Sequence, residues 1–368
     1  MTNEIMTQEF MVNMGPQHPS THGVLRALIT LDGEIVKNCE LHIGYLHRAI
    51  EKIAENRTYN QFIPYTDRLD YVASMSNNFA YVAAVEKLLN VIIPPRADYI
   101  RVIIAELQRI ASHLIWFSTF AMDVGAVSVF LYGFREREEV LNLFEEVCGA
   151  RLTYNYFRIG GISRDLPEGF TVKVFKLINM IKPKLDEYEQ LLTNNAIFLE
   201  RTKNIGVIDS KSAISYGLSG PNLRATGYSW DIRKAIPYSV YPELNFDVPL
   251  GENGDIWDRY KVRIEEIRQC CKILEQAIDK LPSGDIVAKV PKLFKPAAGE
   301  VCNSIESPRG ELGVYIVSDG SAKPYRLKWR APSFSNITVI PEICKGLKIA
   351  DLVAIIASLD PILGEIDR

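Results

Sequence analysis

Two histidines in a short loop near the start of the chain are the residues best suited to proton chemistry. His18 and His22 lie in the segment 14–23, MGPQHPSTHG, whose prolines and final glycine prevent a regular helix or strand. Histidine gains and loses its proton near neutral pH, and the chain contains only 5 histidines. The loop is therefore a candidate proton site. Two imidazoles that only hydrogen-bond to loop backbone would show the same pattern.

The sequence predicts no resident metal or cofactor. On a helix, the spacing H-x-x-x-H would let both imidazoles bind one metal, but Pro19 lies between them and no glutamate follows His18. The 6 cysteines are scattered and none forms a C-x-x-C pair, so neither a disulfide framework nor a zinc or iron–sulfur site is indicated. The glycines of GLSGP and RIGGIS lack the flanking strand and helix of a phosphate-binding loop.

A third candidate is Asp123, the only carboxylate in the apolar segment 113–134. A carboxylate at mid-helix costs about 2.5–3.5 kcal/mol on membrane-insertion scales, so we interpret this segment as a helix buried within the protein. A buried carboxylate must be protonated or find a partner, and such carboxylates often mark functional sites. A structural pair with Arg109 or Arg135 explains Asp123 equally well.

Composition limits the class of protein. A chain of 368 residues that is 47% hydrophobic can bury a sizeable core. Its formal net charge of −3 gives no general basic character, so we expect no nucleic-acid partner. The first residues, MTNEIMTQEF, lack the basic and apolar regions of a secretory signal, and the cysteine usage indicates a reduced, cytoplasmic-side protein.

Sequence periodicity predicts the elements that position these residues. EFMVNM, VLRALITL and EIVKNCEL predict a small antiparallel sheet with the histidine loop between its first two strands, and Asp32–Gly33 suits a type I′ turn. From about residue 48 the apolar spacing becomes helical, and Asp98 is a candidate cap for the longest helix. Helices are predicted over 48–63, 69–92, 99–122, 135–148, 170–193 and 259–281.

The predicted fold class is α+β, mainly α. Residues 1–47 form an N-terminal β-sheet lobe that carries the histidine loop. Residues 48–285 form a central bundle of long helices, interrupted by an irregular insertion over 205–258 that is rich in Gly, Pro, Trp and Tyr. Residues 286–368 form a C-terminal α+β lobe with the strands GELGVYIVS and YRLKWRA and the short amphipathic helix KIADLVAIIASL.

Several long segments are specific enough to indicate a family. They are MGPQHPSTHGVLR, HIGYLHRAIEKIAENRTYNQFIPYTDRLDY, IRVIIAELQRIASHL, YFRIGGISRDLP, GLSGPNLRATG, WDIRKAIPY, ESPRGELGVYIVSDGS and the final GEIDR. From about residue 10 onward the chain resembles the 49-kDa (D) subunit of respiratory complex I, the proton-pumping NADH:quinone oxidoreductase. That resemblance implies an enzyme subunit that is active only in the assembled complex.

The family is similar in turn to the large subunit of nickel–iron hydrogenases, which implies a hydrogenase large-subunit-like fold. Those enzymes hold their metals with the patterns R-x-C-G-x-C and D-P-C-x-x-C. Here Asp70 and Ala73 stand in the thiolate positions of the first pattern, and Ile362 and Glu365 in those of the second. A nickel–iron centre requires soft thiolates, so the resemblance implies a cavity that is free for an organic substrate.

The resemblance also implies a quinone site. The quinone headgroup is expected to bind between Tyr71 and His22, with His22 paired to Asp123. Further residues expected in the quinone cavity are His18, Ile362 and Glu365.

Other positions are expected near the terminal 4Fe–4S cluster, which the neighbouring B subunit carries in this family. Arg48 and Arg68 match family arginines close to that cluster. Thr153 stands where many members have a histidine that contacts it. Threonine does not titrate, so we expect no pH coupling of the cluster through this position. The chain itself is expected to hold no cofactor, and quinone is its expected substrate.

By resemblance, the chain is a peripheral-arm subunit on the cytoplasmic, matrix or stromal side of an energy-transducing membrane. The expected partners are the B (PSST-type), C (30-kDa type) and I (ferredoxin-like) subunits and the H subunit, which forms the quinone channel in the membrane. Two alternatives remain open. One is the same role in a relative that ferredoxin or a deazaflavin feeds with electrons, and the other is a scaffold subunit without chemistry.

Overall fold

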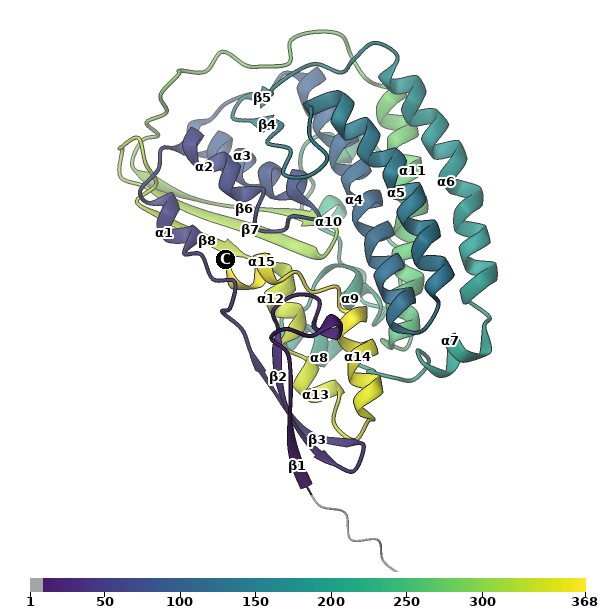
Figure 1. Ribbon diagram of the computed structural model, residues 1–368. Coiled ribbons are helices and arrows are strands. Elements are labelled where there is room, and N and C mark those ends of the chain that lie inside the picture. Colours follow the sequence, from purple (N-terminus) through teal and green to yellow (C-terminus); the bar gives the residue numbers. More distant parts are fainter. Residues whose placement is uncertain (1–8) are drawn as a thin grey trace, which may run out of the picture.

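The computed structural model describes residues 9–368, so the first eight residues of the predicted N-terminal lobe lie outside it. Long helices lie side by side in one half of the molecule, and a three-stranded sheet with shorter helices makes up the other (Figure 1). A second three-stranded sheet, formed by the N-terminal strands, projects away from the bundle. The predicted fold class, α+β and mainly α, is confirmed.

The N-terminal sheet forms as predicted, but its turn differs. Strands β1 (Glu9–Met14), β2 (Arg26–Asp32) and β3 (Ile35–His42) are antiparallel in the order β1-β2-β3. Asp32 pairs with Ile35, so the hairpin loop consists of Gly33 and Glu34 rather than Asp32–Gly33. Only Gly33 has a positive φ, 61°, which fits a type II′ turn and not the expected type I′.

The histidine loop connects β1 to β2 on irregular backbone, as expected. A single 3-10 turn, η1 (Pro19–Thr21), fills its middle, and the two histidines flank this turn. His18 is extended, with a φ of −150°, whereas His22 has the left-handed φ of 51°. Thr21 is fully buried and anchors the loop, because its hydroxyl donates to the His18 carbonyl oxygen at 2.7 Å.

Three helices replace the two predicted over residues 48–92. They are α1 (Ile50–Ala54), α2 (Tyr59–Thr66) and α3 (Ser74–Leu89). The first predicted helix is interrupted because Thr58 begins a new one: its hydroxyl accepts from the Gln61 amide, and the Gln61 side chain accepts from the Thr58 amide. The expected start at residue 69 is also wrong, since residues 67–73 form a loop.

The central bundle consists of α4 (Pro95–Asp123), α5 (Val127–Cys148), α6 (Phe170–Leu192) and α11 (Ile256–Asp279) (Figure 1). All four lie close to their predicted ranges, apart from the earlier starts of α4 and α5. Asp98 does not cap α4, because the helix begins at Pro95 and Asp98 lies within its first turn.

The apolar segment 113–134 is not one buried helix, so that interpretation is wrong. Helix α4 ends at Asp123, the chain turns at Gly125 with a φ of 97°, and α5 then begins. On α5, Val127 and Leu131 are 59% and 61% exposed. Asp123 therefore lies at a helix end near the surface and not at mid-helix. No helix within residues 9–368 combines the length and apolar content that crossing a bilayer requires.

The insertion over 205–258 contains short helices that pack deeply. Two of its arginines, Arg224 and Arg233, are almost fully buried. The short elements of the insertion are α8 (Ser210–Ser215), α9 (Gly220–Arg224), α10 (Ile232–Ala235) and η2 (Tyr241–Glu243), and helix α7 (Ala196–Glu200) directly precedes it.

The C-terminal part contains one strand more than predicted. Strands β6 (Gly299–Ser307), β7 (Gly310–Ser318) and β8 (Arg326–Arg330) are antiparallel in sequence order, and β6 was not expected. Helix α3 packs on β6 and β7. The remaining elements are β4 (Phe157–Arg158), β5 (Gly161–Ile162), α12 (Pro332–Ile337), α13 (Ile340–Ile343), α14 (Ile349–Ser358) and α15 (Leu363–Asp367).

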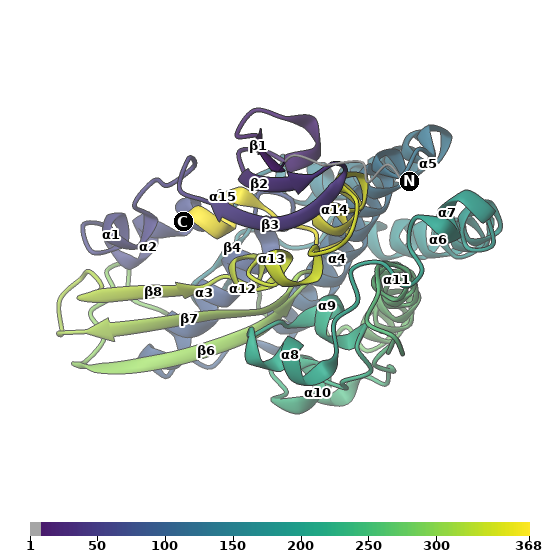
Figure 2. The same ribbon diagram turned by 90° about the horizontal axis from the view of Figure 1, so that it is seen from below.

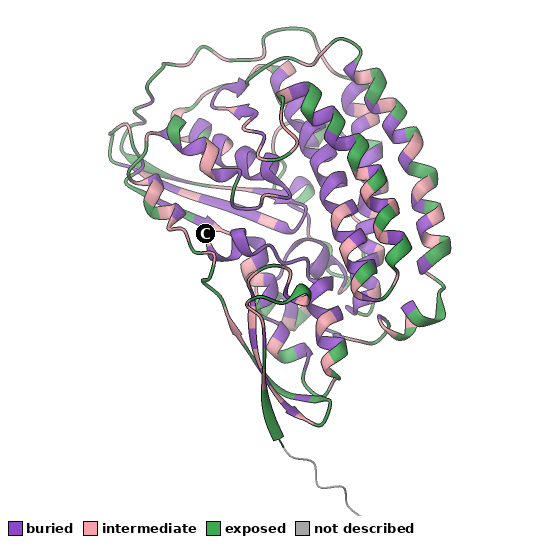
Figure 3. Cartoon of the chain, viewed as in Figure 1, coloured by how far each residue is buried: buried purple, intermediate pink, exposed green. Residues whose placement is uncertain are grey.

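The N-terminal sheet is joined to the C-terminal segment by backbone hydrogen bonds. The amide of Val36 on β3 donates to the Leu347 carbonyl at 2.8 Å, and the Gly346 amide donates back to Val36 at 2.8 Å. Near the site, the Arg48 amide donates to the Arg368 carbonyl at 3.2 Å. Figure 2 shows β3 running beside α13. The buried residues concentrate where these elements face one another (Figure 3).

Close contact between α4 and α5 depends on Gly133. A Cβ atom at this position would lie 2.1 Å from the Ser118 hydroxyl oxygen, which donates to the Leu114 carbonyl at 2.7 Å. We expect Gly133→Ala to lower the free energy of unfolding by about 1–3 kcal/mol, as overpacking does elsewhere. Ser118→Ala in the same chain should restore most of the loss, measured by urea unfolding. Equal stability of Gly133→Ala and the Gly299→Ala control, whose added Cβ meets open space, would contradict this.

Candidate functional site

The short segment at the start of α15 holds the histidine loop and the Tyr71 loop next to one another. A Cβ atom on Gly23, directly after His22, would lie 3.5 Å from a methyl carbon of Leu363. A Cβ atom on Gly364 would lie 3.2 Å from the ring of Tyr71 and only 2.6 Å from the Leu69 carbonyl oxygen. Adjacent residues of one helix therefore touch both loops, and position 364 has room only for glycine.

His22 pairs with Asp123. The ring Nε2 lies 3.1 Å from Asp123 Oδ2, and the two side chains are 18% and 13% exposed. The distance is that of an ion pair, but the angles do not satisfy a hydrogen bond, so neither atom has a hydrogen-bond partner among the described residues. The alternative partners are engaged elsewhere: Arg109 bonds Glu106, and Arg135 bonds Glu136 at 2.6 Å. The structure therefore agrees with the expected His22–Asp123 pair and not with the alternative pair of Asp123 with Arg109 or Arg135.

Tyr71 is half-buried in the loop between α2 and α3. Burial raises the pKa of its hydroxyl, and the neighbouring Asp70 carboxylate raises it further, while Arg309 and Arg48 oppose both effects. Tyr71 therefore keeps its proton at neutral pH and can donate a hydrogen bond. Asp70 also shapes this loop, because its Oδ1 accepts from the amides of Val72 and Ala73 at 3.1 Å each.

The two predicted arginines lie beside Tyr71. Arg48 donates to the carbonyl oxygens of Arg68 at 2.8 Å and Gly364 at 3.0 Å, so it joins the Tyr71 loop to α15. Arg68 is exposed, and its guanidinium donates to the Pro64 carbonyl. Thr153 occupies a left-handed turn after α5, with a φ of 52°.

Asp67 directly precedes Arg68 in the chain. Its carboxyl group is near Asn155, in the turn that also contains Thr153. Burial raises the pKa of Asp67 to about 7, although the charge of Arg68 lowers it, and both carboxyl oxygens are buried without a hydrogen-bond partner among the described residues. Sequence reasoning did not identify this titratable group. Its only signal was its place directly before an arginine expected at the site.

The residues predicted to line the cavity do not form one cluster. His18 is exposed, and its Nδ1 accepts from the Ser20 amide at 3.2 Å, so it caps the η1 turn. Ile362 and Glu365 lie at the start of α15 and are 8% and 0% exposed. Glu365 is therefore inside the protein, behind the residues that touch Tyr71.

A buried ionic cluster surrounds Arg309, which sequence reasoning did not single out. Its Nη1 lies 2.7 Å from Asp70 Oδ2, and its Nη2 lies 3.2 Å from Asp360 Oδ1. Glu365 completes the cluster, with its Oε2 accepting from the Ser333 amide at 3.2 Å. The available signals were the two hydrogenase-like patterns, which contain both aspartates, and the ESPRGELG segment, which contains the arginine.

Burial controls the protonation of this cluster. It raises the pKa of Glu365 to about 8, and the nearby Asp70 adds to the effect, while Ser333 and Arg309 lower it. Burial also raises the pKa of Asp70, with Arg309 opposing. Glu365 is therefore harder to ionise than an ordinary glutamate.

His113 belongs to a separate buried network. Its Nε2 lies 2.7 Å from Glu266 Oε2, and both side chains are fully buried. Arg224 bonds both Glu266 and Glu306. His113 is thus paired within the core between α4 and α11.

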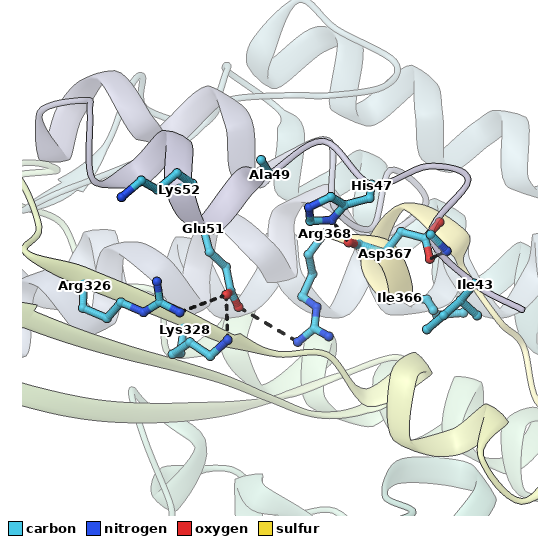
Figure 4. Close-up of a pocket in the computed structure, with 11 residues that line it drawn as sticks. Ile43, His47, Ala49, Glu51, Lys52, Arg326, Lys328, Ile366, Asp367 and Arg368 are labelled. Carbon is cyan, nitrogen blue, oxygen red and sulfur yellow. Dashed lines mark hydrogen bonds and ion pairs between the residues drawn. The ribbon is translucent and has the colours of Figure 1, made fainter.

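A surface hollow of about 430 Å³ lies along the C-terminal residues Ile366–Arg368 (Figure 4). Glu51 is at its centre, 2.7 Å from Lys328 and 3.9 Å from Arg326. His47 Nδ1 lies 2.7 Å from the Asp367 carbonyl oxygen. None of Tyr71, His22 and Asp123 lines this hollow.

Comparison with known proteins identifies the family. The family profile described as "Respiratory-chain NADH dehydrogenase, 49 Kd subunit" matches residues 123–368. The chain is 52% identical over 364 residues to the D subunit of the NADH-quinone oxidoreductase of Bacillus mycoides, covering 99% of this chain and 100% of that protein. The chain belongs to the 49-kDa subunit family.

Other relatives of this 49-kDa family agree over the full length. The D subunit of the NADH-quinone oxidoreductase of Geotalea uraniireducens is 52% identical over 392 residues, covering 100% of both chains. The corresponding D 2 subunit of Solibacter usitatus is 54% identical over 360 residues, covering 98% of this chain and 97% of that one. Relatives that share the whole chain are thus named as subunits of an oxidoreductase complex, and this family member is one too.

In this 49-kDa family member, the positions that resemble hydrogenase thiolates carry the buried acids Asp70 and Glu365. Ala73 and Ile362 occupy the other two positions. Residues 9–368 contain no group of three His, Cys, Asp or Glu side chains arranged to hold a metal ion. The free cysteines lie elsewhere, for example Cys39 on β3 and Cys270 on α11.

The raised pKa of Glu365 predicts a pH-dependent stability. The folded pKa of about 8 exceeds the ordinary value of 4.5, so this contribution is fully present below about pH 4.5 and is lost as the pH rises through about 8. Glutamine does not titrate. We expect the melting temperature of Glu365→Gln, relative to the unsubstituted full chain, to increase from pH 5 to pH 9. If the difference in melting temperature between Glu365→Gln and the unsubstituted chain stays the same from pH 5 to pH 9, the raised pKa of Glu365 is contradicted.

Proposed function

We propose that this chain binds the headgroup of a quinone between the Tyr71 hydroxyl and the His22 imidazole and supplies protons for its reduction. The observation that carries the proposal is the packing of Leu363 and Gly364 against the two loops, which brings the loop of Tyr71 and the loop of His22 to neighbouring residues of one short helix. The name that the relatives share, NADH-quinone oxidoreductase, agrees with a quinone as the substrate.

Tyr71 is suited to the first hydrogen bond. Reduction of a quinone to a quinol takes two electrons and two protons, and negative charge develops on the quinone oxygens as electrons arrive. Because burial and Asp70 keep the Tyr71 hydroxyl protonated, it can donate to one quinone oxygen and stabilise that charge.

His22 and Asp123 are suited to the second oxygen. Asp123 faces Nε2 of the ring, so Nδ1 is the nitrogen that can face the quinone. The carboxylate, 3.1 Å from the ring, fixes the ring orientation. When the ring gives a proton to the quinone, its interaction with Asp123 changes. We expect the η1 loop to move as a result and to signal to the proton-pumping membrane arm.

Electrons reach the quinone, in this proposal, from the terminal 4Fe–4S cluster of the B subunit. The exposed Arg68, together with Arg48 and Thr153, forms the surface that faces this partner. The C, I and H subunits complete the surroundings, and the last of these forms the quinone channel. The chain then lies in the peripheral arm on the cytoplasmic, matrix or stromal side of the membrane, and donors such as ferredoxin would feed the same site.

Tyr71→Phe removes the hydroxyl and keeps the ring. We expect the assembled complex to lose about 10²-fold in quinone-reductase turnover, because a positioned proton donor contributes about that much. The measurement is NADH oxidation with a short-chain quinone. Tyr325→Phe, at an exposed tyrosine just before β8, is the matched control and should keep its turnover. Full turnover of Tyr71→Phe would remove Tyr71 from the site and would favour a scaffold role.

Asp123→Asn removes the charge beside His22 and keeps the shape. We expect turnover to fall about tenfold at neutral pH, because the His22 ring loses the carboxylate that orients it. Asp319→Asn, at an exposed aspartate after β7, is the control. If Asp123→Asn keeps the turnover of the control, Asp123 has no role in the reaction.

A further inference from the structure

The Arg309 guanidinium lies behind the Tyr71 loop and reaches three other segments of the chain. Its Nη1 donates to Asp70 Oδ2 at 2.7 Å and to the Ser112 hydroxyl oxygen on α4 at 3.1 Å. Its Nη2 donates to Asp360 Oδ1 at 3.2 Å, in the segment that leads into α15. All of these side chains are buried, so water hardly competes for the bonds.

The backbone of Arg309 is itself held in place. Arg309 lies in the turn between β6 and β7, and its carbonyl oxygen accepts from the side-chain amide of Asn336 at 3.0 Å. Its backbone amide donates to the Ser307 hydroxyl oxygen at 3.3 Å. A Cβ atom on Gly220 would lie only 2.7 Å from the Arg309 carbonyl oxygen, so α9 packs directly on this turn. The guanidinium therefore extends from a fixed base.

The bond from Arg309 to Asp70 orders the backbone around Tyr71. One carboxylate oxygen of Asp70, Oδ2, accepts from Arg309. The other, Oδ1, accepts from the amides of Val72 and Ala73 at 3.1 Å each. An aspartate that bonds to the backbone shortly after it fixes a turn, and Tyr71 is the residue that this turn encloses. The direction of the Tyr71 side chain therefore depends on how Arg309 holds Asp70.

The bond from Arg309 to Asp360 fixes the helix that packs on the Tyr71 ring. Asp360 lies shortly before α15 and has the left-handed φ of 56°, which is uncommon for a residue other than glycine. In α15, Gly364 is so close to Tyr71 that an added Cβ atom would lie 3.2 Å from the ring. One guanidinium thus holds both the loop that carries Tyr71 and the helix that faces it.

We propose that Arg309 is a positioning residue of the quinone site, which sets the place of the Tyr71 hydroxyl by holding Asp70 and Asp360 at the same time. This inference rests on the proposed function. Arg309 acts through Tyr71 and does not itself donate to the quinone. Lysine cannot replace it, because a single ammonium nitrogen lacks the planar fork that serves two carboxylates at once.

The test is a double-mutant cycle between Arg309 and Tyr71, measured as NADH-driven turnover of a short-chain quinone by the assembled complex. Arg309→Lys keeps the positive charge that the buried aspartates require and removes the fork. We expect kcat to fall about tenfold, because a small misplacement of a catalytic group is costly. In the Tyr71→Phe background we expect almost no further loss, since no hydroxyl remains to be misplaced. The same fold-loss in both backgrounds overturns the proposal, and so does full kcat in Arg309→Lys.

Arg233→Lys is the matched control. Arg233 is equally buried and likewise bonds two carboxylates, those of Asp231 and Glu106, but these partners belong to α4 and the start of α10 and not to the Tyr71 loop. We expect the effect of Arg233→Lys on kcat to be the same factor in both backgrounds. If its loss also disappears in Tyr71→Phe, the coupling is not specific to Arg309 and the proposal fails.

Infrared difference spectra of a bound quinone with ¹³C-labelled carbonyls give a readout that does not depend on turnover. A hydrogen bond from Tyr71 lowers the stretching frequency of one quinone carbonyl. We expect this lowered band to move toward its position in Tyr71→Phe when Arg309 is replaced by lysine. Asp360→Asn weakens only the arm to α15, keeps the shape of the side chain, and should produce a smaller shift in the same direction. An unchanged band in both variants overturns the proposal.

The cycle also separates this inference from the proposed function. If Tyr71→Phe loses turnover while Arg309→Lys costs the same factor in both backgrounds, the quinone site stands and only the role of Arg309 fails. If Tyr71→Phe keeps full turnover, the proposed function itself fails.

Discussion

The structure of the site depends on the close packing of Gly364 against the Tyr71 loop. With any side chain at this position, the added Cβ would lie 2.6 Å from the Leu69 carbonyl oxygen, so only glycine lets α15 approach this loop. The same short helix also meets the histidine loop through Leu363, and Arg48 reinforces the contact by donating to the Gly364 carbonyl. Residues far apart in the sequence are thereby held together by one short element.

Buried charge is the second organising feature. Asp70 and Glu365 occupy the positions that resemble metal-binding thiolates, and Arg309 neutralises two carboxylates of this region. The Arg309 guanidinium compensates Asp70 and Asp360, and burial raises the pKa of the third carboxyl group, Glu365.

Much of the fold could be predicted because periodicity and turn residues encode local structure. The three N-terminal strands and the ranges of α6 and α11 agree with the pattern of apolar residues. Strand β6 was missed, because CNSIES alternates too weakly to predict a strand. The segment 113–134 was misjudged, since periodicity alone cannot show that Gly125 adopts a φ of 97° and reverses the chain.

The candidate site was less accessible to sequence reasoning. His22, Tyr71 and Asp123 could be named from residue type and family resemblance, and the structure supplies the His22–Asp123 pair. The ion pairs of Arg309 and the burial of Glu365 depend on contacts between distant segments, which no local pattern encodes. The most direct test of the account is an experimental structure of the assembled complex with a bound short-chain quinone. We predict that its two oxygens lie within hydrogen-bond distance of Tyr71 and His22, whereas a headgroup bound away from both residues would contradict the account.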